Sequence, residues 1–152
     1  MTKELNENEI INALPYRDPF LFVDTVDAID ENGVRGSYTF SADHEFYKGH
    51  FKQRPVTPGV ILTETMAQIG VVCLGIFLLG KKIGENLKEE FPKIALTSSA
   101  IDFFIPVFPG ERVEVVSKRE VWRFGKLRCS VQMFNEKGEL VCRGMISGMV
   151  QL

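Results

Sequence analysis

The chain has 152 residues, the length of one domain of ordinary size. Apolar residues make up 45% and charged residues 25%, a globular composition that excludes disordered, collagen-like and low-complexity chains. The formal net charge of −2 argues against a nucleic-acid partner, because nothing supplies the broad basic face that such proteins need. No repeat, charge block or linker divides the chain, so we predict a single domain over residues 1–152.

The cysteines and the amino terminus predict the compartment. Cys73, Cys129 and Cys142 have no metal-type spacing, and any disulfide scheme would leave one of them unpaired. A reducing compartment is therefore the simpler interpretation. The first ten residues contain no apolar segment typical of a secretory signal, so we expect a cytoplasmic protein.

The amino-terminal third contains a short helix and a hairpin. A capping-box pattern predicts a helix over residues 6–13. Two segments rich in Val, Ile, Phe and Thr, residues 20–30 and 34–40, flank Asn32-Gly33, which is a strong hairpin signal. Residues 41–58 contain glycine and proline breaks and are predicted to be a loop.

The longest apolar stretch, residues 60–79, predicts a helix. Twenty apolar residues are enough to cross a bilayer. Glu64 and Gln68 argue against this, because a carboxylate in lipid is unfavourable and no aromatic belt marks the ends. We therefore predict no membrane span, and instead a helix buried on all sides inside the protein.

A charged loop over residues 81–92 leads into four strand-like segments: 93–105, 111–122, 126–135 and 139–151. The order is helix, two strands, long buried helix, four strands. An antiparallel sheet wrapped round one long central helix, an α+β fold, would bury every apolar segment. The twelve phenylalanines suit a large apolar interior or an apolar cavity.

The last two segments pair well as a hairpin. Apolar and polar residues alternate with period two along residues 127–134. If Glu136 and Lys137 form the loop, Met133 faces Leu140, and one face of the hairpin is apolar throughout.

Glu64 is the first candidate catalytic residue, because it is the only charged residue in the apolar helix. Gln68 lies one turn further on the same face. Burial disfavours the charged form, so the pKa of Glu64 should rise and leave an acid that can donate a proton near neutral pH. The alternative is a structural carboxyl satisfied by Gln68 and a backbone amide, and the helix alone does not separate the two.

His50 favours the catalytic interpretation. It lies in the proline-containing loop before the helix, and together with a buried glutamate it would supply a base and an acid. The other histidine, His44, lies between Asp43 and Glu45, and we predict a solvated or turn-stabilising role for it.

Pro58-Gly59-Val60 opens the predicted helix. Its free amides carry the positive end of the helix and could polarise a carbonyl oxygen, and Gly59 would let a ligand approach the backbone. The alternative is an ordinary turn before a helix. No serine elbow or metal-type cluster is present, and Cys73 lies deep in the apolar helix, so we expect no covalent nucleophile, no metal and no cofactor. Proton abstraction next to a carbonyl, with loss of a leaving group, fits these residues.

GHFKQRPVTPGV, followed by Glu64 fourteen residues after His50, resembles the 3-hydroxyacyl-acyl-carrier-protein dehydratases of the FabZ type. LPYRDPFLFVD (14–24) and DFFIPVFPGERVEV (102–115) extend the resemblance over nearly the whole chain. It implies a hotdog fold and a homodimer, or a trimer of such dimers.

In the implied mechanism His50 takes the C2 proton of a (3R)-3-hydroxyacyl thioester, and Glu64 protonates the departing C3 hydroxyl. Each active site would combine His50 of one subunit with Glu64 of the other. The backbone amides at Gly59 and Val60 would hold the thioester carbonyl, and Gln68 would orient Glu64.

The sequence departs from the family pattern at three positions. Lys52 replaces a proline, Tyr16 replaces the histidine of Leu-Pro-His-Arg, and Glu111 replaces an aspartate. Lys52, with Lys48 and Arg54, adds positive charge suited to an acidic acyl carrier protein or its phosphopantetheine phosphate. The alternative for these three cations is a solvated loop.

Two other functions stay open beside the dehydratase. The same scaffold could carry an acyl-thioesterase, because fold does not determine function and hydrolysis also needs a carboxylate. A non-catalytic subunit that binds acyl carrier protein is the third possibility. The pathway, whether fatty-acid synthesis or specialised lipid or polyene synthesis, and the acyl chain length are not readable from the sequence.

Overall fold

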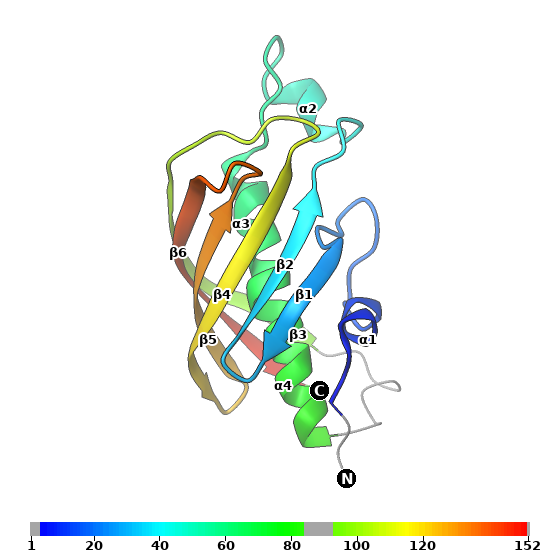
Figure 1. The fold of residues 1–152 in the computed structure, drawn as a ribbon, viewed down its shortest axis with the longest axis vertical. Coiled ribbons are helices and arrows are strands. Elements are labelled where there is room, and N and C mark those ends of the chain that lie inside the picture. Colours follow the sequence, from blue (N-terminus) through cyan, green and yellow to red (C-terminus); the bar gives the residue numbers. More distant parts are fainter. Residues whose placement is uncertain (1–3, 84–92, 152) are drawn as a thin grey trace.

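One antiparallel sheet curves round a central helix in the computed structural model, which describes residues 4–83 and 93–151 (Figure 1). The strand order across the sheet is β1-β2-β4-β5-β6-β3. The strands are β1 (Thr25–Asp30), β2 (Gly33–Thr39), β3 (Lys93–Phe103), β4 (Arg112–Arg123), β5 (Lys126–Phe134) and β6 (Leu140–Gln151). The predicted α+β architecture is confirmed.

The helices are α1 (Glu7–Asn12), α2 (Phe46–Gly49), α3 (Gly59–Ala67), a π-helical turn η1 (Gln68–Val72) and α4 (Cys73–Ile83). The capping box that predicted α1 is present, because Asn6 and Glu9 bond each other's backbone amides. The short α2 was not predicted and lies inside the expected loop. The other expected loop, residues 81–92, begins as the end of α4 and otherwise lies outside the described residues.

The central helix runs from α3 through η1 to α4, and 78% of its most apolar window, of mean hydropathy 1.9, is buried inside the protein. That burial is typical of a core helix and accounts for its apolar composition without a membrane. The prediction of burial on all sides is wrong for the first turns, where Val60 is 76% exposed and Glu64 is half-buried. Among the helix residues whose side chains are described, those from Thr65 to Gly80 are all buried.

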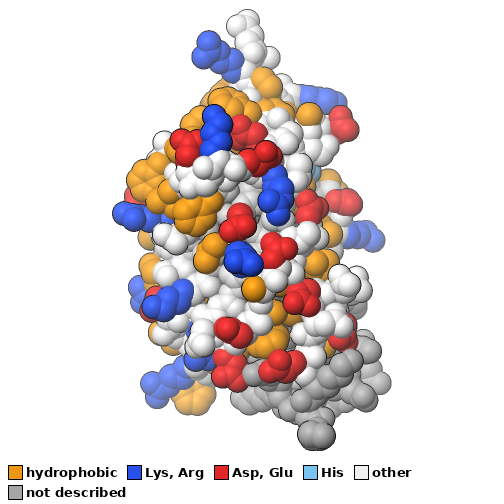
Figure 2. Space-filling view, viewed as in Figure 1, with side chains coloured by type: hydrophobic (Ala, Val, Ile, Leu, Met, Phe, Trp, Pro, Cys, Tyr) orange, Lys and Arg blue, Asp and Glu red, His pale blue; other side chains and the backbone are white. Residues whose placement is uncertain are grey.

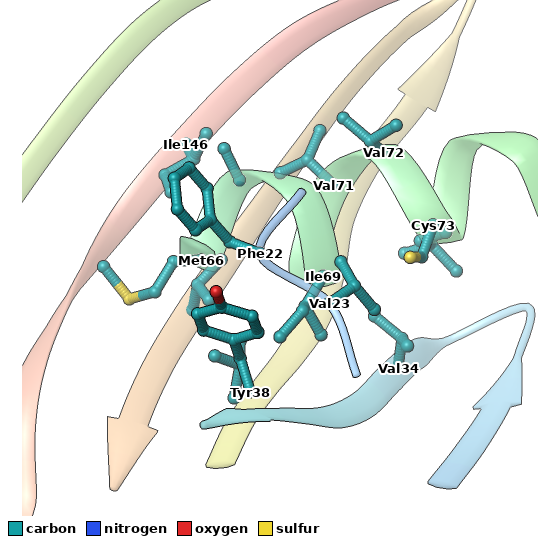
Figure 3. Packing of buried hydrophobic residues seen from close by; sticks show 14 of the residues in the cluster. Phe22, Val23, Val34, Tyr38, Met66, Ile69, Val71, Val72, Cys73 and Ile146 are labelled. Atoms are coloured by element: carbon teal, nitrogen blue, oxygen red, sulfur yellow. The ribbon is translucent and has the colours of Figure 1, made fainter. Parts of the chain in front are cut away.

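The core joins this helix to the concave face of the sheet. Figure 3 shows Met66, Ile69 and Cys73 of the helix packed with side chains of the neighbouring loop and strands, among them Phe22 and Ile146. The outer face of the sheet carries interspersed acidic and basic side chains in Figure 2. The sheet therefore has one apolar and one solvated face, the usual arrangement of an antiparallel sheet.

Three predicted details of the strands are corrected. Residues 20–24 are not part of β1, because the Phe22 amide bonds the Gln68 side chain instead of a strand. The loop between β1 and β2 is Glu31-Asn32, since Asp30 pairs with Gly33. Gly33 is required by a close approach: an added Cβ would lie 2.1 Å from the carbonyl oxygen of Ser117 in β4.

The third correction concerns the β5–β6 hairpin, whose register is shifted by two residues. Met133 pairs with Cys142, not with Leu140, and an irregularity separates Met133 from Phe134. A shift of two leaves the same residues on the buried face, so alternation of apolar residues cannot detect it. The longer loop decides the register, with the Asn135 amide bonded to the Glu139 carbonyl and Gly138 at a φ of +77°.

Candidate functional site

His50 follows α2 and is held in one ring orientation and one tautomer. Its backbone N–H donates to the Phe46 carbonyl at 3.0 Å, and its backbone carbonyl accepts from the Val56 N–H at 2.9 Å. The ring Nδ1 lies 2.8 Å from the Val56 carbonyl oxygen. A carbonyl can only accept, so Nδ1 carries the proton in the neutral ring, and Nε2 is left as a free base.

Glu64 lies in α3 and receives one hydrogen bond from Gln68, whose Nε2 is 3.0 Å from Oε1 of Glu64. Burial raises the pKa of the Glu64 carboxyl, and the Gln68 hydrogen bond opposes this shift in part. A carboxyl with a raised pKa retains its proton closer to neutral pH and can act as a general acid. The predicted direction of the pKa shift is confirmed.

Gln68 is fully buried, and its amide orientation is determined by backbone groups. Its Oε1 accepts from the Phe22 N–H at 2.8 Å, and its Nε2 donates to the Phe20 carbonyl at 3.0 Å. The remaining N–H of the same Nε2 therefore points at Glu64, so Oε1 of Glu64 acts as acceptor and the acidic proton belongs on Oε2.

The first testable prediction concerns this buried amide. Gln68→Leu would leave three polar groups without their bonds, each worth about 1–3 kcal/mol when buried. We expect Tm to fall by at least about 4 °C in a thermal melt. The control is Gln132→Leu, the same change at an exposed position of β5. An equal Tm for Gln68→Leu and wild type would show that the hydrogen bonds of Gln68 do not stabilise the fold.

Gly59 and Val60 provide two backbone amides at the start of α3. Pro58 is the N-cap and has no side-chain cap, and its carbonyl accepts from the Ile61 N–H at 2.9 Å. Within the described chain the N–H groups of Gly59 and Val60 have no partner, as expected for the first turn of a helix. They are available for a carbonyl oxygen.

An open cleft, here called the Gly59 cleft, lies in front of these amides. The Phe103 ring packs 3.2 Å from where a Cβ of Gly59 would be, so a side chain at residue 59 would require the ring to shift by a few tenths of an ångström. The cleft is lined by Thr57, Gly59, Leu62, Phe103, Phe104, Ile105 and Pro106.

A second cavity, here called the Glu64 cavity, lies on another side of the helix. Gly59 and Glu64 are separated by about 140° round the helix axis at 3.6 residues per turn. The cavity is lined by Tyr16, Glu64, Ala67, Val71, Val72, Ile94, Ala95, Leu96, Gly148 and Val150. Val71 and Val72 thus line this cavity, whereas Phe103 lines the Gly59 cleft, and Ile76 and Phe77 are core residues.

The predicted residues thus form two groups within one chain. Glu64 and Gln68 are in direct contact, whereas His50 is tied to Val56, two residues before the helix. Among the described residues no hydrogen bond joins His50 to Glu64. Both groups are complete locally, and His50 is not among the residues that line the Glu64 cavity within one subunit.

Other candidates have structural roles. For His44 we predicted a solvated or turn-stabilising role; the side chain is partly buried, its Nε2 lies 2.7 Å from the Tyr38 hydroxyl, and its ring stacks on Phe46 with centroids 4.8 Å apart. Burial raises the pKa of the Cys73 thiol to about 12, so this cysteine is not a nucleophile. No cluster of three potential metal ligands occurs among the described residues.

The three predicted cations surround the His50 loop and are exposed. Lys48 is paired with Glu45 at 3.1 Å, whereas Lys52 and Arg54 lie in the tight turn where Phe51 and Arg54 exchange backbone hydrogen bonds. The sequence did not single out the Val56 carbonyl or the backbone of residues 20–22 as parts of the site. Their roles depend on contacts between segments far apart in the chain, which residue patterns do not reveal.

Known proteins match this chain over nearly its whole length. The FabA-like domain family matches residues 14–147. A 3-hydroxyacyl-[acyl-carrier-protein] dehydratase FabZ from Clostridium perfringens is 35% identical over 146 residues, which are 93% of this chain and 96% of the relative. The protein of the same name from Sinorhizobium medicae is 34% identical over 93% of this chain and 87% of its own.

Solved structures share the fold. The dehydratase heterocomplex ApeI:P from Xenorhabdus doucetiae has a TM-score of 0.69 at 17% identity, covering 94% of this chain and 90% of the other. A thioesterase from Haemophilus influenzae has a TM-score of 0.67 at 12% identity, covering 98% and 92%. Dehydratases and thioesterases thus share this architecture, so the fold alone does not separate the two activities.

Proposed function

This chain belongs to the FabA-like family, and we propose that it removes water from (3R)-3-hydroxyacyl thioesters of acyl carrier protein to give trans-2-enoyl thioesters. It is a hydro-lyase of fatty-acid or related lipid biosynthesis. The observation that carries the proposal is the Glu64 carboxyl, which burial keeps protonated towards neutral pH beside an apolar cavity. The working unit is one domain over residues 1–152 in the cytoplasm.

The reaction needs a base, an acid and a polarised carbonyl. The thioester oxygen accepts from the amides of Gly59 and Val60, which makes the C2 proton more acidic. Nε2 of His50 takes that proton, the C2–C3 double bond forms, and the C3–O bond breaks. Glu64 gives its proton to the leaving hydroxyl, which departs as water. Gln68 keeps the acidic proton on Oε2 of Glu64.

The base and the acid come from two subunits of a homodimer, and strand β3 supports this arrangement. It is an edge strand, and nearly all of its side chains are at least partly exposed. Leu96, near its start, lines the Glu64 cavity, and Phe103, at its end, lines the Gly59 cleft.

Antiparallel pairing of β3 with a second copy would place the start of each strand beside the end of the other. The Glu64 cavity of one subunit would then meet the Gly59 cleft and His50 loop of its partner. Two equivalent composite sites follow from one twofold axis. A trimer of such dimers would retain both sites in each dimer.

The decisive experiment is mass spectrometry of the protein incubated with (3R)-3-hydroxyacyl carrier-protein thioesters of several chain lengths. We expect the acyl group to lose one water, and the most reactive length gives the chain preference. Loss of the whole acyl group would indicate a thioesterase instead. Retention of an unchanged thioester at every length, with tight binding, would indicate a non-catalytic acyl-carrier subunit.

A second prediction concerns docking of the carrier protein. Lys52 and Arg54 are exposed beside His50, where they can attract an acidic protein. Reversing both charges to Glu is expected to raise KM for the carrier-protein thioester about tenfold. The same acyl group on free pantetheine should react unchanged. Lys126→Glu, at the β4–β5 turn on the opposite end of the sheet from α2 (Figure 1), is the control, and an equal effect on both thioesters would contradict a docking role.

A further inference from the structure

The Glu64 cavity contains a second polar side chain that the reaction does not use. This cavity of about 30 Å³ lies between the central helix and strands β3 and β6. Its lining side chains are apolar except for Glu64 and Tyr16. A few polar groups in an otherwise apolar pocket are what determines the orientation and identity of a ligand.

The Tyr16 side chain is half-buried. Within the described chain it has no hydrogen-bond partner, and its ring contacts Phe20 at a centroid distance of 6.3 Å. Burial, followed by the charges of Glu64 and Cys73, raises the pKa of Tyr16 to about 12. The phenol therefore remains a hydrogen-bond donor at every pH at which the enzyme would work.

The position of Tyr16 relates it to the acyl chain beyond the reacting carbons. Its hydroxyl interacts electrostatically with both Glu64 and Cys73, which lie about 13 Å apart along the helix at 1.5 Å per residue. It therefore lies alongside the part of the helix that carries Val71 and Val72. Figure 3 shows these two valines on the side of the helix away from Val34.

The path of the acyl chain rests on the proposed function. If Glu64 protonates the C3 hydroxyl, then C3 lies at the Glu64 end of the cavity. The carbons beyond C3 then extend along Val71 and Val72, past the Tyr16 hydroxyl.

We propose that Tyr16 makes the Glu64 cavity selective for acyl chains that carry a hydrogen-bond acceptor, such as a keto or ether oxygen, a few carbons beyond C3. A saturated chain would displace water from the Tyr16 hydroxyl and leave it without a partner, which is unfavourable in an apolar site. An acceptor at the matching carbon would restore the bond. Sites built to bond a polar group discriminate strongly against ligands that lack it.

The test moves one oxygen along the chain. In a series of 3-hydroxyacyl thioesters of equal length, an ether oxygen replaces one methylene at each position from C5 to C8, and each is compared with the all-carbon chain. We expect one position at which Tyr16→Phe lowers the ratio of the ether to the all-carbon kcat/KM about tenfold or more. Tyr16→Phe should also improve the all-carbon substrate.

A binding measurement separates this inference from the proposed function. Acyl pantetheine compounds without the 3-hydroxyl cannot be dehydrated, and calorimetry should give the same position-dependent ratio of affinities. Tyr38→Phe is the control, because that hydroxyl bonds His44 outside the cavity. Ratios equal in wild type and Tyr16→Phe at every position would overturn the role of Tyr16. Absence of dehydration with all thioesters, with the binding ratios as expected, would overturn only the proposed reaction.

Discussion

Glu64→Gln is expected to lower kcat for dehydration about a hundredfold or more. Glutamine has the shape of a protonated glutamate but no proton of comparable acidity, so the leaving hydroxyl would depart without a proton donor. The measurement is enoyl-thioester formation by mass spectrometry at saturating substrate. Glu120→Gln, the same exchange at an exposed position of β4, is the control, and wild-type turnover in Glu64→Gln would exclude Glu64 as the acid.

The same variant has a predicted effect on stability with a definite sign. Burial raises the pKa of Glu64 in the folded state above its unfolded value. Its contribution to stability is therefore fully present below the unfolded pKa of about 4.3 and is lost as the pH rises through the folded pKa. Glu64→Gln should melt at a higher temperature than wild type at pH 8, and the difference should shrink towards pH 4.

His50→Asn is expected to have an effect of similar size, about a hundredfold or more on kcat. Asparagine retains an N–H near the position of Nδ1 and can still donate to the Val56 carbonyl, but it lacks the basic Nε2. The loop should therefore stay folded while C2 proton abstraction fails. An unchanged Tm with lost turnover is the expected pair of results, and retained turnover would contradict the assignment of the base.

Mixing the two inactive variants tests whether each site draws on two subunits. When the two variant dimers exchange subunits, each mixed dimer has one site that contains both substitutions and one site that contains neither. About one quarter of wild-type activity should return when half of the dimers are mixed. If His50 and Glu64 of the same chain acted together, no site would be intact, and mixing would restore nothing.

The central helix, the strands β3 to β6 and the chemistry of Glu64 could be predicted from the sequence. These depend on local properties: the run of apolar residues, alternation with period two, and the effect of burial on one carboxyl in an apolar segment. The motif around His50 and Glu64 added the reaction through resemblance. The surroundings of His44 were mispredicted, because its neighbours in sequence are polar while Phe22 and Tyr38 reach it from elsewhere in the chain.

The sequence by itself therefore determined the architecture, and it predicts Glu64 as the acid and His50 as the base. Only the tertiary structure shows which neighbouring groups position the side chains of His50 and Glu64. The Val56 carbonyl selects the tautomer of His50, and the backbone of residues 20–22 directs Gln68 at Glu64. The position of Tyr16 in the lining of the Glu64 cavity and the two-residue shift of the β5–β6 register also became visible only there. Such features arise from single hydrogen bonds and contacts between distant segments, whereas residue patterns report only the burial of each segment.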